Sequence, residues 1–216
     1  MRILRDNGLT IVLLGMFAGS IIGQWIAGWN VEMEEAHRRG QAVLPLGAYT
    51  VSPEFLSSVF ENWESEFLQM AAYVVLTAVL AQRGSAELKD PDAPPRDTDI
   101  QENKPGAPAI LNWGSFWRAL YARSLGLALG LVFFLSFIIH WTQSARVAAQ
   151  EAIAHGEIPL ATIAHLSDAQ LWFESFQNWQ SEFLSIAVLV LLSIFLRQRE
   201  SPESKGVAAP HSQTGE

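Results

Sequence analysis

One stretch of this sequence occurs twice, and the repetition limits the possible folds more than any other feature. Residues 62–68 read NWESEFL and residues 178–184 read NWQSEFL, an offset of 116 residues. Self-similarity at a fixed offset indicates repeated structural units. We therefore predict two tandem copies of one unit. The same offset, without a gap, relates other identical pairs: Ser20 and Ser136, Trp25 and Trp141, Phe60 and Phe176, Glu87 and Glu203, Lys89 and Lys205.

Apolar residues gather in four blocks, at residues 9–29, 67–81, 125–141 and 183–196. The first and third approach the roughly 20 residues that span a bilayer core, and aromatic segments lengthen the second and fourth. We predict an all-α integral membrane four-helix bundle made of two tandem duplicated helical hairpins. The alternative is a soluble helical protein with buried helices. It is disfavoured because apolar blocks this long without a charge are rare in soluble helices.

Helix signals extend each hairpin beyond its apolar blocks. Ser52 before Pro53 predicts one helix start and Asp168 another, and nothing in the sequence breaks a helix over 53–83 or 169–199. About thirty residues give roughly 45 Å of helix, more than the roughly 30 Å of a bilayer core. We therefore expect the helices to extend beyond the outer face of the membrane.

Composition divides the chain into four parts. Residues 1–83 form the first transmembrane hairpin and residues 113–199 the second. The linker at 84–112 and the tail at 200–216 are rich in residues that disfavour a packed core. We expect both to be disordered and cytoplasmic.

The basic residues predict the orientation in the membrane. If both termini and the linker face the cytoplasm, eleven of the fourteen lysines and arginines lie on that side. This distribution follows the positive-inside rule. We therefore expect a multi-pass protein of the bacterial inner (plasma) membrane with cytoplasmic N and C termini. The outer segments are acidic, which argues against nucleic acid as a partner, and the chain has no cysteine.

Polar residues near the outer boundary of the apolar blocks are the strongest site candidates. In each copy an Asn and a Glu lie four residues apart, on one helix face, and the partner helix offers a second polar pair. The expected polar layer consists of Ser20, Gln24, Asn62, Glu66, Ser136, His140, Asn178 and Glu182.

This layer has two interpretations. In the first, it holds the helices together, with Glu accepting hydrogen bonds from Asn, Gln or His. In the second, it is an ion or proton site made of two carboxylates and His140, which would titrate near neutral pH. One His and two Glu can also bind a divalent ion, but no recognised ligand motif is present. We expect neither a metal nor a cofactor.

Two further patterns concern the helix surfaces. Tryptophans are enriched where helices meet the membrane surface, and four are expected at the outer interface: Trp25, Trp63, Trp141 and Trp179. The first helix carries Gly15, Gly19 and Gly23 at a spacing of four. Such small residues allow close helix packing in a membrane. The stripe fits packing inside one bundle or, alternatively, a homodimer seam.

The sequence contains no nucleophile elbow, phosphate loop, zincin helix or dinucleotide fingerprint. The favoured hypothesis is therefore a non-enzymatic integral membrane protein with a structural or partner-binding role, its protein partner unidentified. The alternative hypothesis is a small ion or proton transporter or channel that uses Glu66, Glu182 and His140.

Several motifs resemble a known family. They include FENWESEFLQM at 60–70, GSAE at 84–87, KDPD at 89–92 and FESFQNWQSEFL at 173–184. Together they are similar to a bacterial family of multi-pass membrane proteins catalogued as a domain of unknown function. The resemblance covers essentially the whole chain. It implies a small bacterial membrane protein and brings no catalytic residues with it.

Overall fold

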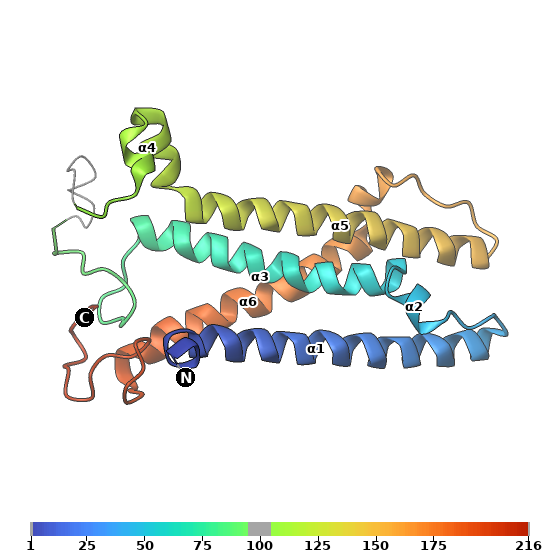
Figure 1. Cartoon of the computed structure of the whole chain (residues 1–216). Coiled ribbons are helices and arrows are strands. Elements are labelled where there is room, and N and C mark those ends of the chain that lie inside the picture. The colour runs from blue at the N-terminus through green and yellow to red at the C-terminus, as the bar shows by residue number, and fades with distance from the viewer. Residues whose placement is uncertain (1, 95–104, 216) are drawn as a thin grey trace. The chain divides into compact units, whose positions relative to one another are not determined.

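The structure is a computed structural model that describes residues 2–94 and 105–215, with side chains from residue 6 onward. Residues 95–104 of the predicted linker lie outside the described residues. The described chain is helical, without strands (Figure 1). Its elements are α1 (Arg2–Arg39), α2 (Leu46–Tyr49), α3 (Pro53–Val79), η1 (Ala109–Asn112), α4 (Ser115–Tyr121), α5 (Ser124–Ala154), η2 (Ala164–Ser167) and α6 (Ala169–Phe195).

The helix starts follow the local sequence signals. The Ser52 hydroxyl accepts a hydrogen bond from the Phe55 amide at 3.2 Å, and Pro53 is the first residue of α3. The Asp168 carboxylate accepts from the Gln170 amide at 2.8 Å and caps α6. Such caps satisfy amides that have no partner inside the helix. Both predicted starts are confirmed.

The predicted helix ends are wrong by about one turn. α3 ends at Val79 instead of residue 83, and α6 ends at Phe195 instead of residue 199. Basic side chains donate hydrogen bonds to backbone carbonyls near the ends of both helices. Lys89 Nζ donates to the Ala78 oxygen at 2.6 Å, and Arg197 Nη1 donates to the Ile194 oxygen at 3.2 Å. These bonds satisfy helix-end carbonyls without a further turn of helix.

Within the described residues, three helices are long and apolar enough to cross a membrane: Asp6–Arg39, Ser124–Ala154 and Ala169–Phe195. They cover three of the four predicted apolar blocks, except for Leu196 at the end of the last one. α3 is not among them, because Glu54, Glu61, Glu64 and Glu66 occupy its first half. An all-α protein with three apolar helices is confirmed, whereas the fourth span and the duplication stay predictions.

The three apolar helices present large hydrophobic side chains on their surfaces. On α1, Leu9 is 75% exposed and Met16 is 65% exposed, and Leu131 on α5 is 60% exposed. Water-soluble monomers rarely expose apolar surface continuously along a helix of this length. Lipid is the solvent that suits such a surface.

The chain forms two compact units, each described here by itself. One comprises Met1–Val59 with Ile139–His165, and the other comprises Phe60–Ile138 with Leu166–Glu216. We call them the first and the second unit. Each unit takes residues from both sequence copies, because α3 and α5 both contribute to the two units. The domain boundaries expected from composition stay a prediction.

Candidate functional site

In the second unit, a buried carboxylate joins α3 to α6. Glu64 is fully buried. Its Oε1 atom accepts a hydrogen bond from the Ser175 hydroxyl at 2.8 Å and another from the Trp179 indole Nε1 at 3.2 Å. A buried charge is costly unless donors surround it. The two donors on α6 supply that compensation.

Two more residues of α3, one on either side of Glu64, make hydrogen bonds to α6. Asn178 Nδ2 donates to Glu61 Oε1 at 2.5 Å. Gln69 Nε2 donates to the Glu182 backbone oxygen at 2.8 Å and to the Ser185 hydroxyl at 3.0 Å. We call these contacts, together with those of Glu64, the polar seam between α3 and α6. The polar seam runs from Glu61 to Gln69 and therefore extends over more than two helical turns.

Residues separated by 116 positions in the sequence interact in the second unit. Gln69 and Ser185, which are hydrogen bonded, are 116 residues apart, the offset of the repeat. The negative charges of Glu66 and Glu182, which are also 116 residues apart, repel each other.

The second unit holds five members of the predicted polar layer. Asn62 and Glu66 are exposed, Asn178 and Glu182 are partly buried, and Ser136 is buried. Two predicted interface tryptophans also lie here. Trp63 packs on Phe60 with ring centres 5.1 Å apart, and Trp179 lies in an aromatic cluster with Phe133, Trp172 and Phe176.

The first unit holds the remaining predicted residues. Gln24 Nε2 donates to the Ser58 hydroxyl at 3.2 Å, Ser20 is exposed and His140 is fully buried. Trp25 is partly buried, and Trp141 Nε1 donates to the Thr162 oxygen at 3.0 Å. The glycines of the α1 stripe, Gly15, Gly19 and Gly23, are exposed. Packing inside one bundle and a homodimer seam both stay predictions for this stripe.

The first unit also contains an acid-lined cavity of about 900 Å³. Its charged lining consists of Glu32, Glu35, Arg39, Glu54 and Glu151, with His155 at one side. Arg39 Nη2 pairs with Glu35 Oε2 at 2.8 Å, so the other three glutamates give the lining a negative excess. We call this space the acidic cavity.

The tyrosine next to the acidic cavity responds to this negative charge. Tyr49 is 5% exposed and directly follows Ala48, a lining residue. Burial raises the pKa of Tyr49, and the charges of Glu32 and Glu54 raise it further. The site therefore disfavours additional negative charge, and a cation is the ligand that its electrostatics suit.

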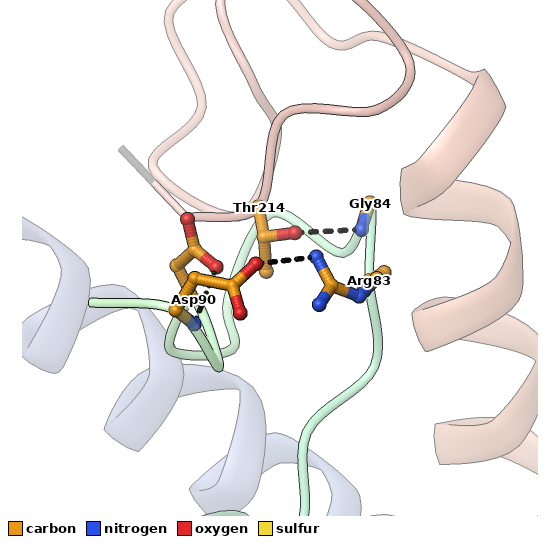
Figure 2. A network of polar contacts seen from close by, with 5 residues as sticks. Arg83, Gly84, Asp90 and Thr214 are labelled. Carbon is orange, nitrogen blue, oxygen red and sulfur yellow. Dashed lines mark hydrogen bonds and ion pairs between the residues drawn. The ribbon is translucent and has the colours of Figure 1, made fainter.

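At the other end of the second unit, the tail docks on the residues after α3. Lys205 is only 3% exposed, and its Nζ atom donates to the backbone oxygens of Gly84, His211 and Gln213 at 2.5, 2.9 and 3.0 Å. These bonds occupy all three donors of an ammonium group. The Gly84 amide donates to the Thr214 hydroxyl at 2.9 Å (Figure 2). Residues for which composition predicts disorder thus carry specific contacts.

Charged side chains accompany the docked tail. Arg83 Nη1 pairs with Asp92 Oδ2 at 2.7 Å, and this arginine lowers the pKa of Asp92. Glu87 Oε2 accepts from the Tyr73 hydroxyl at 2.5 Å. The charge of Glu87 raises the pKa of Glu203, its repeat equivalent, with burial as a smaller cause. Residues 116 positions apart therefore interact here as well.

Sequence reasoning missed the centre of the polar seam. It chose Glu66 because that residue lies four positions after Asn62, but the fully buried carboxylate belongs to Glu64. A signal was present: Glu64 corresponds to Gln180 and Val59 corresponds to Ser175, so the two copies differ at these positions. The positions at which the two stretches differ therefore indicated the buried contact better than the positions at which they are identical.

The fold and these contacts define an all-helical protein whose described chain has three helices able to cross a membrane. The sequence matches, over residues 1–216, the model of a family described as a domain of unknown function (DUF6766). The chain belongs to this family. Searches among curated proteins and among solved structures gave no match. The predicted membership in a domain of unknown function over the whole chain is confirmed. The bacterial source and the multi-pass topology stay predictions.

Two neighbouring glutamates of α3 allow a matched test of the polar seam. We expect Glu64→Leu to lower the free energy of unfolding by about 1–3 kcal/mol, because it leaves the Ser175 and Trp179 donors buried without an acceptor. Glu66→Leu makes the same chemical change at an exposed position and should stay within about 0.5 kcal/mol of wild type. Unfolding in detergent checks both variants. Equal losses in the two would contradict the assignment.

Proposed function

We propose that this protein is a multi-pass integral membrane protein in which two tandem repeats pack around a pseudo-twofold axis, with both termini in the cytoplasm. Interactions between equivalent residues support the axis: Gln69 is hydrogen bonded to Ser185, and the charges of Glu66 and Glu182, and of Glu87 and Glu203, repel each other. Two hairpins of the same orientation require an axis along the membrane normal. The distribution of basic residues supports the orientation.

The proposal requires α3 to be a fourth span. Its 27 residues give about 40 Å of helix, enough to cross a bilayer core. The glutamates in its first half make α3 too polar to be recognised as a membrane span from its own composition. However, Glu61 and Glu64 accept hydrogen bonds from α6, which reduces the cost of removing these carboxylates from water. α3 therefore crosses as the partner of α6.

The absence of cysteine allows a direct test of topology, because single cysteines can be introduced without background. In intact bacterial spheroplasts, we expect Cys at Asp6 and at Ser212 to be protected from a membrane-impermeant maleimide. Cys at Glu34 and at Glu157 should react. An even number of spans predicts this pattern. Labelling that puts Asp6 and Ser212 on opposite sides would require an odd number of spans and would overturn the proposal.

The role we propose is non-enzymatic binding of a small organic cation in the acidic cavity. The observation that carries it is the cavity of about 900 Å³ with four glutamates in its lining. Pockets that hold small molecules commonly have volumes of about 300–1,000 Å³. The lining belongs to α1, the segment before α3, the start of α3, and the second half of α5. In the proposed topology this region lies outside the membrane, open to ligands from the outer side.

Spermidine is a suitable probe for this site. We expect calorimetry of the protein in nanodiscs to detect spermidine binding that weakens at least tenfold in the double variant Glu54→Gln/Glu151→Gln. Each lost carboxylate removes a charge partner, worth about 1 kcal/mol or more where solvent is partly excluded. The control is Glu34→Gln/Glu157→Gln, which changes the net charge equally but lies outside the lining. No binding, or equal weakening in both variants, would contradict the proposal.

A second candidate function is ion or proton passage at Glu66, Glu182 and His140. The observation that favours it is the electrostatic repulsion between Glu66 and Glu182, since a proton or a cation relieves the repulsion of two like charges. Against it, the helix segments that follow these residues are almost wholly apolar. A water-filled path through them would need polar side chains. We therefore favour binding over transport.

A further inference from the structure

A short aromatic segment precedes α5 in the second unit. Trp113, Phe116, Trp117, Leu120 and Tyr121 follow the spacing i, i+3, i+4, i+7 and i+8. This spacing places apolar side chains on one face of a helix. α4 spans Ser115–Tyr121 and therefore aligns the last four of these residues, while Trp113 precedes α4 and joins them through the contact of its ring with Trp117. We call these five residues the aromatic face.

The aromatic face is not covered by the described part of the chain. Trp113 is 63% exposed and Phe116 is 70% exposed, and Trp117, Leu120 and Tyr121 are each about two-fifths exposed. Three of its rings pack against one another. The centres of Trp113 and Trp117 lie 5.9 Å apart, and those of Phe116 and Trp117 lie 5.5 Å apart, both edge to face. The result is one continuous amphipathic aromatic surface.

The charge around the aromatic face is positive. Between residues 105 and 150 the chain has no aspartate or glutamate, although its overall net charge is −8. Arg118 and Arg123 lie in and directly after α4. Arg123 is exposed, and its Nη1 atom donates to the Ala119 oxygen at 3.2 Å. Arg118 is partly buried, and its buried Nε atom has no hydrogen-bond acceptor among the described residues. Arginine is the side chain best suited to phosphate oxygens.

The position of α4 next to α5 indicates what covers the aromatic face. Two turn residues, Ala122 and Arg123, separate α4 from α5, which is one of the three helices able to cross a membrane. Figure 1 shows α4 turned away from the axis of α5. A segment at the mouth of a span that is not part of it lies at the level of the lipid headgroups. Tryptophan and tyrosine are enriched at that level.

We infer that α4 is an in-plane anchor whose aromatic face lies in the boundary between headgroups and acyl chains, with Arg118 and Arg123 on anionic lipid phosphates. The inference rests on the proposed membrane insertion of α5. Its chemistry is that of interfacial amphipathic helices, which combine an aromatic and aliphatic face with basic residues and prefer anionic lipid. A second copy of the chain, or a soluble partner, would cover the face in a different way that the test below distinguishes.

The test uses a fluorescent probe on single cysteines of the full chain in vesicles. Leu120→Cys places an environment-sensitive NBD label on the aromatic face, and Ala119→Cys places it on the other side of α4. In phosphatidylcholine vesicles containing phosphatidylglycerol, we expect blue-shifted emission at position 120 and several-fold stronger quenching by doxyl lipid there than at 119. Tyr121→Cys is the alternative site if the Leu120 variant does not fold.

The arginines give the second arm of the experiment. Each arginine near an anionic surface should favour the docked state by about fivefold. Removing phosphatidylglycerol, or introducing Arg118→Gln/Arg123→Gln, should therefore reduce the quenching at 120. Immersion that does not depend on anionic lipid would overturn the role of the arginines. A water-exposed label at 120, or one shielded from both water and doxyl lipid, would overturn the anchor.

Vesicle flotation after carbonate extraction separates this inference from the proposed function. If the protein remains with the vesicles while the label at 120 is in water, the anchor is wrong and membrane insertion stands. If the protein is extracted, the proposed insertion itself fails.

Discussion

The contact of α3 with α6 depends on one constraint: a carboxylate leaves water only when donors replace the water. Glu64 accepts hydrogen bonds from Ser175 and Trp179, and Glu61 accepts one from Asn178. In each case α3 supplies the acceptor and α6 the donor. Loss of either partner strands a polar group in a buried position, which costs more than the intact bond contributes. These hydrogen bonds allow the acidic first half of α3 to pack against α6.

The two copies have diverged in a complementary way at this contact. The first copy has Val59 and Glu64 where the second has Ser175 and Gln180. If the second helix had the residues of the first, Glu64 would face a valine in place of Ser175 and would lose that hydrogen-bond donor. Glu66 and Glu182 keep that identity, and one is exposed and the other only partly buried, where water screens their repulsion. Divergence at the buried positions and identity at the wetter ones follow from the same electrostatics.

How far the sequence predicts this protein depends on whether a feature is local. Ser52 and Asp168 mark helix starts through bonds within three residues, and both were predictable. The end of α3 was not, because Lys89 reaches back eleven residues to the Ala78 carbonyl. The spacing of Asn62 and Glu66 identifies a helix face but not its direction, so Glu64 was missed. The acidic cavity draws its lining from segments more than 90 residues apart, for instance Glu54 and Glu151.

We propose that the carboxylates Glu66 and Glu182 have a structural role, in a membrane protein that binds its ligand outside the bilayer. Proton and cation flux in proteoliposomes tests this most directly, with wild type compared with the variant Glu66→Gln/Glu182→Gln. The account predicts no flux above that of empty liposomes in either protein. Flux in wild type that disappears in the folded variant would contradict it and would make these two glutamates part of a transport path.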